Sequence, residues 1–156
     1  MKATLILVGK TTEEVFVRAI ADYAGRIAHY LPFNIVTIPE LKNTKKLSEA
    51  QQKVREGELI LREIQPSDTV VLLDEHGKEF RSVDYAAWLQ KKQNTARRLV
   101  FVIGGAYGFS EAVYSRADEK ISLSKMTFSH QMVRLIFVEQ LYRACSIIRG
   151  EPYHHE

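Results

Sequence analysis

Cysteine and long apolar runs are nearly absent from the sequence, and each absence excludes a class of protein. Cys145 is the only cysteine, so no internal disulfide can form, and a reducing cytoplasm is the expected location. Apolar runs such as Val70–Leu73 and Leu99–Ile103 are far shorter than the roughly 20 residues of a membrane-spanning helix. The sequence therefore predicts no association with a membrane.

A strong charge of one sign and low-complexity segments are also absent. The 22 basic residues only slightly outnumber the 19 acidic ones, a balance that is compatible with RNA binding without requiring it. The 156 residues show no repeat and no interdomain linker, so we expect a single domain over residues 1–156. The apolar start, Met1–Gly9, is too short for a signal peptide and lacks a small-residue cleavage site, so it predicts a first strand.

Short apolar runs alternate with longer amphipathic stretches along the chain. The runs predict strands at 3–8, 34–38, 69–73, 99–103 and 120–123. The stretches predict helices at 12–30, 48–64, 82–93 and 129–148, with a short one that begins near Ser110. This alternation is typical of an α/β fold in which a mostly parallel sheet is flanked by helices.

Local features refine this scheme. Ser48 and Ser82 are expected to cap the starts of their helices, and His76–Lys78 is expected to form a turn. The first helix is expected to carry one apolar face, formed by Val15, Ala19, Tyr23 and Ile27.

Three strand ends carry residues suited to ligand binding, because ligands of open parallel sheets bind beyond the carboxyl ends of the strands. These segments are Leu72–Gly77, Ile103–Phe109 and Leu123–Phe128. The second contains G-G-x-x-G rather than the dinucleotide fingerprint G-x-G-x-x-G, so its glycines indicate either a tight turn or a ligand contact. By itself, the third favours a plain connection over a cofactor loop.

The last helix is apolar on more than one side, which indicates that it packs against its own domain and against a second copy in a dimer. Glu139 and Arg143 lie four residues apart, and this spacing favours a surface ion pair over a contact of Arg134 or Arg143 with a phosphate or substrate carbonyl. The apolar residues are Met132, Leu135, Ile136, Val138, Leu141, Tyr142, Cys145 and Ile148.

The carboxyl-terminal tail begins with a helix stop, since Gly150 suits a C-cap and Pro152 prevents continuation. Tyr153, His154 and His155 could stack on a base and transfer a proton, but their position favours a frayed end. Two adjacent histidines do not define a metal site, so we expect no metal.

Taken in order, these segments resemble the 23S rRNA (pseudouridine1915-N3)-methyltransferases of the trefoil-knotted SPOUT superfamily. The resemblance covers essentially the whole chain. It differs from the family's pattern at Ser129, where proline is common, and at His155, where arginine or lysine is usual. The matching segments are Val8–Lys10, Val102–Gly105 with Gly108, Leu123–Phe128 with His130, Val133–Arg134, Glu139–Ala144 and Pro152–His154.

The resemblance implies a deep carboxyl-terminal trefoil knot, a homodimer and S-adenosylmethionine as methyl donor. It implies that the substrate is 23S rRNA in the assembled 70S ribosome, and that the tail closes the active site. The cofactor-binding residues that it implies are Leu73, Gly104, Gly105, Leu123, Ser124, Lys125, Met126, Thr127 and Phe128.

Methylation at N3 of a pseudouridine requires the removal of a weakly acidic imide proton. The expected catalytic residues are His154 as the base, Tyr153 as a stacking ring, and Arg143 as the cation beside the developing charge. A bound water is an alternative base. The rival functions are a non-enzymatic RNA-binding protein of the same fold and a nucleotide-binding hydrolase or oxidoreductase, which would lack its usual motifs here.

Overall fold

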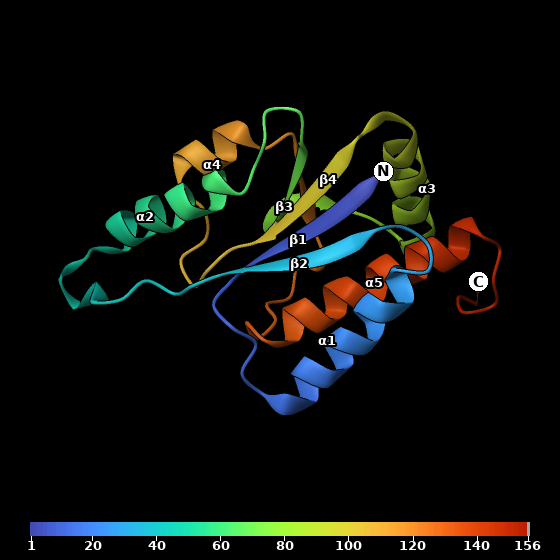
Figure 1. Ribbon diagram of the computed structural model, residues 1–156, viewed down its shortest axis with the longest axis horizontal. Helices are drawn as coiled ribbons and strands as arrows, with labels where there is room; N and C mark the ends of the chain where they lie inside the picture. Colours follow the sequence, from blue (N-terminus) through green and yellow to red (C-terminus); the bar gives the residue numbers. More distant parts are fainter. Residues whose placement is uncertain (156) are drawn as a thin grey trace.

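The computed structural model describes residues 1–155, in which five parallel strands form one sheet in the order β2-β1-β4-β3-β5 (Figure 1). This architecture confirms the predicted α/β class. The elements are β1 (Lys2–Val8), α1 (Glu14–Ile27), β2 (Phe33–Ile38), the 3-10 turn η1 (Thr44–Lys46), α2 (Glu49–Arg62), β3 (Thr69–Glu79), α3 (Ser82–Thr95), β4 (Arg98–Ile103), α4 (Glu111–Arg116), β5 (Glu119–Ser122) and α5 (Met132–Ile148).

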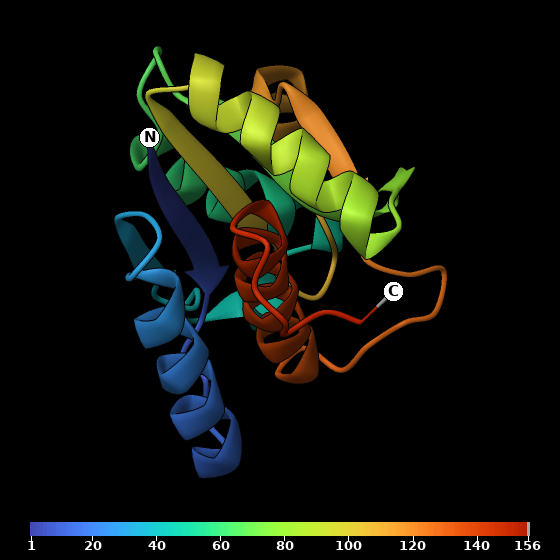
Figure 2. The ribbon, with the colours of Figure 1, turned by 90° about the vertical axis from the view of Figure 1, so that its right-hand side faces the viewer.

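Helices cover both faces of the sheet, as Figures 1 and 2 show. In β1, Leu5 and Leu7 pack in a cluster with α1, α3 and α5, whereas Ile6 and Val8 pack in a cluster with α2 and α4. Successive side chains of a strand point to opposite faces, so a strand that is buried on both sides must be apolar throughout. That requirement explains why the apolar runs located the strands.

The third strand differs from its prediction, because β3 continues through the expected turn at His76–Lys78 to Glu79. The register against β5 shifts between Leu73 and Lys78, which makes residues 74–77 an irregularity in the ladder. Gly77 lies against the partner strand so closely that a Cβ atom would be 2.6 Å from the Ile121 backbone. The glycine therefore serves close strand approach rather than a turn.

Two helix predictions were also wrong in detail. Ser82 is the first residue of α3 and follows the N-cap Arg81, and its hydroxyl donates to Gln140 Oε1 at 2.9 Å instead of capping the helix. Val15 is 68% exposed, so it does not belong to the buried face of α1, on which Ile20 and Ile27 are buried. The cap at Ser48 is confirmed by a complete capping box.

The last helix uses much of its apolar surface inside its own chain. Val138, Leu141 and Cys145 are buried against the sheet and the neighbouring helices, so they do not form a second apolar side. Met132 is exposed, and Ile136 is half-buried. The dimer and the threading of α5 through a knot both stay predictions. Within residues 1–155, every helix is too short or too polar to cross a bilayer.

The thiol of Cys145 offers a test of this packing. Burial raises the pKa of this thiol to about 12. At pH 8 it then holds about a thousandth as much thiolate as an exposed cysteine, and the thiolate is the reactive form. We expect iodoacetamide to label the native protein extremely slowly and the urea-unfolded protein at the ordinary rate, as measured by mass spectrometry. Equal rates would contradict the buried position.

Candidate functional site

The three strand-end segments meet at the carboxyl edge of the sheet, around a cavity of about 580 Å³ that we call the strand-end cavity. Its walls include the end of the apolar part of β3 at Leu73, the loop Gly104–Phe109, and Phe128 before α5. A smaller adjoining cavity of about 140 Å³ shares Leu73 and Phe128 and is lined mainly by the loop from Ser122. The structure therefore brings the sequence-predicted cofactor residues together.

Lys125 is the exception among those residues. It lines neither cavity; its side chain is 87% exposed, and its Nζ lies 3.9 Å from Glu79 Oε1. The other eight predicted positions line one cavity or both: Leu73, Gly104, Gly105, Leu123, Ser124, Met126, Thr127 and Phe128.

The glycines of the second segment lie close to side chains of the same chain. A Cβ atom on Gly104 would lie 2.9 Å from the ring of Phe109, and one on Gly105 would lie 2.5 Å from Glu56 Oε2. The Gly105 N–H donates to Glu56 Oε1 at 2.9 Å, and burial raises the pKa of that carboxyl group. Both glycines thus have a packing role, so a substitution at Gly104 would disturb Phe109 as well as any ligand.

Arg134 is fully buried, and its role differs from the contact with a phosphate or substrate carbonyl that the sequence left open. Its guanidinium donates to the carbonyl oxygens of Val8 (2.8 Å) and Gly9 (2.9 Å) and to the hydroxyl of Thr11 (2.9 Å). Desolvation by burial lowers the pKa of this guanidinium. Sequence reasoning missed the role because the partners lie more than 120 residues away, and no local spacing reports them.

The same guanidinium fixes the ring of His130, which lies exposed at the rim of the strand-end cavity. Arg134 Nη2 is 3.0 Å from His130 Nε2. Nε2 also lies 3.4 Å from the Val8 carbonyl oxygen, but the shorter contact with the guanidinium, which has donors only, assigns the acceptor role to Nε2 and the ring proton to Nδ1. His130 is therefore held as a hydrogen-bond donor through Nδ1.

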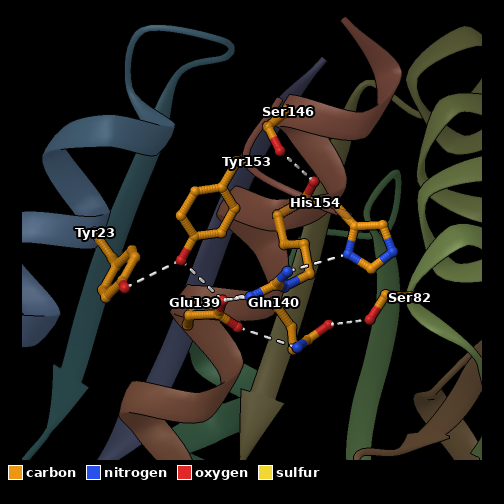
Figure 3. Close-up of polar contacts among 8 residues, drawn as sticks. Tyr23, Ser82, Glu139, Gln140, Ser146, Tyr153 and His154 are labelled. Carbon is orange, nitrogen blue, oxygen red and sulfur yellow. Dashed lines mark hydrogen bonds and ion pairs between the residues drawn. The ribbon is translucent and has the colours of Figure 1, made fainter. Parts of the chain in front are cut away.

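A second polar cluster forms where the tail folds back on α5, as Figure 3 shows. The Tyr153 hydroxyl donates to Glu139 Oε1 at 3.0 Å and lies 3.2 Å from the Tyr23 hydroxyl. Arg143 donates to Glu139 Oε1 through Nε at 3.1 Å, which confirms the predicted ion pair, and its Nη1 lies 3.1 Å from His154 Nδ1. Burial, Tyr23 and Glu139 together raise the pKa of Tyr153.

The tail is therefore packed, and the expectation of a frayed end was wrong. Gly150 has a left-handed φ of 69° and its N–H donates to the Ile147 carbonyl, while the Glu151 N–H donates to the Ser146 carbonyl. This pair of bonds is a Schellman motif, which confirms the predicted C-cap and turns the chain back along the helix. Only His155 of the three tail aromatics is fully exposed.

The contact between Arg143 and His154 bears on proton transfer. Since the guanidinium donates, Nδ1 accepts and the ring proton sits on Nε2. While this contact holds, His154 is a donor, and action as a base at Nδ1 requires Arg143 to move away. The assignment of His154 as the base stays a prediction.

The tail cluster and the strand-end cavity lie at opposite ends of α5. Val133 lines the cavity, and Arg143 follows it by ten residues, which is about 15 Å along a helix axis. Neither cavity of the carboxyl edge is lined by Arg143, Tyr153 or His154 in the part of the chain that the structure describes. One chain alone does not bring the predicted catalytic and cofactor residues together. Among residues 1–155, no three His, Cys, Asp or Glu side chains are grouped as a metal site would need.

Fold and site together define an α/β protein with a ligand cavity at the carboxyl edge of a parallel sheet and a glycine-rich loop in its wall. A family model described as "Predicted SPOUT methyltransferase" matches residues 1–154. The chain belongs to this family of enzymes.

Curated relatives support the same assignment over the full length. The ribosomal RNA large subunit methyltransferase H of Bacteroides fragilis is 62% identical over 157 aligned positions that cover 100% of both chains. Proteins of the same name from Parabacteroides distasonis and Flavobacterium johnsoniae are 62% and 54% identical, again over 100% of both chains.

Substitution of Arg134 tests the buried hydrogen-bond array. Arg134→Met leaves the acceptors at Val8, Gly9, Thr11 and His130 without their donor, and the expected loss is about 3 kcal/mol in the free energy of unfolding. Urea unfolding followed by circular dichroism measures it. Arg18→Met, on the exposed face of α1, is the matched control and should leave the midpoint unchanged. An unchanged midpoint for Arg134→Met would mean that the array contributes nothing.

Proposed function

We propose that this enzyme transfers a methyl group from S-adenosylmethionine to N3 of pseudouridine 1915 in 23S rRNA, in the cytoplasm and on the assembled 70S ribosome. The observation that carries the proposal is the convergence of the strand-end segments on one cavity in a chain 62% identical to proteins named as large-subunit rRNA methyltransferases. We further propose that residues 1–156 form one knotted domain.

The residues of the cavities fit S-adenosylmethionine. Leu73, Leu123 and Phe128 give the smaller cavity apolar walls that suit a flat base, and the loop from Ser122 to Phe128 offers backbone groups beside it. The carboxylates of Asp74 and Glu75 line both cavities, and they suit the positive charges of the cofactor. When bound, the cofactor supplies a methyl group activated by its sulfonium.

The tail cluster supports the acceptor side of the reaction. Arg143 is held by Glu139, and its guanidinium lies 4.8 Å above the Tyr153 ring, so a positive charge and an aromatic face are presented together. We propose that Arg143 steadies the negative charge that develops on the imide oxygens, that Tyr153 stacks on the base, and that His154 or a water takes the N3 proton.

We propose that the working unit is a homodimer in which the tail of one chain completes the cavity of the other. The separation of the two groups of residues along α5 supports this arrangement, because positioning of the reacting groups within contact distance is what methyl transfer requires. The half-buried Ile136 and the exposed Met132 leave apolar area on α5 for a partner.

Truncation and mixing test the shared site. A chain that ends at Pro152 keeps the Schellman motif but loses the Tyr153 bonds to Glu139 and Tyr23, so it should fold, bind S-adenosylmethionine by calorimetry and fail to methylate. Phe128→Asp should lose cofactor binding. When the truncated chain and the Phe128→Asp chain dimerise at random, about a quarter of all sites should combine an intact cavity with an intact tail. The activity of these sites is measured as tritium transfer to 70S ribosomes.

Three outcomes would contradict these proposals. Full turnover by the truncated chain would remove the tail from the chemistry, and an inactive mixture of well-formed mixed dimers would remove the shared site. Failure of the parent protein to bind S-adenosylmethionine would instead favour the non-enzymatic RNA-binding protein.

A charge on α5 tests the position of the dimer interface. Ile136→Glu would bury an unpaired carboxylate in the proposed contact, so sedimentation should give monomers. Val54→Glu, at a 52% exposed position on α2 in the opposite layer, is the matched control and should stay dimeric. An active dimer of Ile136→Glu would place the interface elsewhere.

A further inference from the structure

A second cavity of about 290 Å³ lies on the other side of the glycine-rich loop, between that loop, the end of β1 and α2; we call it the acidic cavity. It shares Gly105, Ala106, Tyr107 and His130 with the strand-end cavity. The loop is therefore a partition, and whatever occupies the acidic cavity lies next to the proposed site of methyl transfer.

The walls of the acidic cavity offer hydrogen-bond acceptors. Glu56 projects from α2 and is half-buried, with Oε1 on the Gly105 N–H. Glu40 follows β2 and packs so closely over Gly9 that a Cβ atom there would lie 2.6 Å from its Oε1. Among the described residues that line this cavity there is no lysine or arginine. An anion therefore suits this cavity poorly, and a suitable ligand supplies hydrogen-bond donors to the two carboxylates.

Two further groups restrict which kind of ligand the acidic cavity can bind. His130, fixed by Arg134 with its proton on Nδ1, adds one donor beside the two carboxylates. Tyr107 is 47% exposed at the partition and offers an aromatic face. Carboxylate acceptors, an imidazole donor and a stacking ring match the edge of a base whose exocyclic amino group lies next to a ring acceptor.

The chain segment that borders the acidic cavity carries the opposite charge. Leu41 and Thr44 line the cavity, and the lysines beside them in the chain, Lys42, Lys45 and Lys46, are all exposed. In RNA complexes, basic side chains hold the phosphate backbone while buried groups read the base. An acidic interior with a basic segment beside it fits a nucleotide inserted base first.

We propose that the acidic cavity is a subsite for an unpaired, amino-bearing base of the RNA substrate (adenine, cytosine or guanine), adjacent to the nucleotide that is methylated. Uracil is disfavoured, because it carries no amino group for Glu40 and Glu56. The proposal rests on the proposed function for the identity of the RNA, but base binding itself can be measured without any methylation.

The experiment is a titration of the full-length ¹⁵N-labelled dimer with AMP, CMP, GMP and UMP, followed by amide chemical shifts. The amino-bearing nucleotides should shift Gly105, Ala106 and Tyr107, and UMP should shift them much less. Glu40→Ala should weaken AMP and CMP binding roughly tenfold. Glu56→Gln, which keeps an acceptor for Gly105, and Tyr107→Ala should act in the same direction. Glu58→Ala on the exposed side of α2 is the charge-matched control and should change nothing.

The outcomes distinguish two sources of the hydrogen-bond donor in the acidic cavity, the amino group of a base and the ammonium group of the cofactor. Equal shifts with UMP, or binding that Glu40→Ala and Glu56→Gln both leave intact, would overturn the proposal. If the same two variants weaken S-adenosylmethionine binding in calorimetry and leave the nucleotides unaffected, the cavity serves the ammonium group of the cofactor instead. If the protein binds these bases selectively but methylates no RNA, the proposed function is contradicted and the proposed base subsite is not.

Discussion

The Arg134 guanidinium joins the start of α5 to the carboxyl end of β1 through hydrogen bonds to Val8, Gly9, Thr11 and His130. A buried guanidinium is costly unless its donors are satisfied. Nη1 and Nη2 of Arg134 have acceptors, Nε has none among the described residues, and the charge of Glu40 favours the cation, so these groups must stay together once the protein is folded. The bonds set where the last helix begins, and thereby where the predicted cofactor loop, which ends at Phe128, can lie. Both cavities of the carboxyl edge depend on this attachment.

The central strands and the layers could be read from the sequence because one rule applies along strands that are covered on both faces. A strand covered on both faces must be apolar throughout, and Leu99–Ile103 meets that rule without any knowledge of its neighbours. Residues 74–79 do not meet it. They are polar, and residues 74–77 lie outside the ladder, because Leu73 and Lys78 both pair with Ile121. Gly77 lets the Ile121 backbone come close, a contact with a residue more than 40 positions away.

In the candidate site as well, some features could be predicted from the sequence and others could not. The predicted cofactor loop and the glycines line the cavities of the carboxyl edge because they follow strands, where parallel sheets place their ligands. The packed tail was not found from position alone, because its order comes from the Tyr153 contact with Tyr23, 130 residues earlier, and from Glu139 on α5. The role of Arg134 was missed because i to i+4 spacing reports only local pairs such as Glu139 and Arg143.

Two histidines of this protein are each held by an arginine, with opposite tautomers. Arg134 donates to Nε2 of His130, and Arg143 donates to Nδ1 of His154, so the proton of each neutral ring is assigned to its other nitrogen. Such rings bind carbonyl oxygens better than they remove protons. If the substrate meets them in this state, the positive charge of Arg143 must do part of what a base would do, because a nearby cation favours the deprotonated imide. On the proposed mechanism, the chain would then contribute chiefly by placing fixed donors and one charge around a nucleotide, which would lose its proton more readily there than in water.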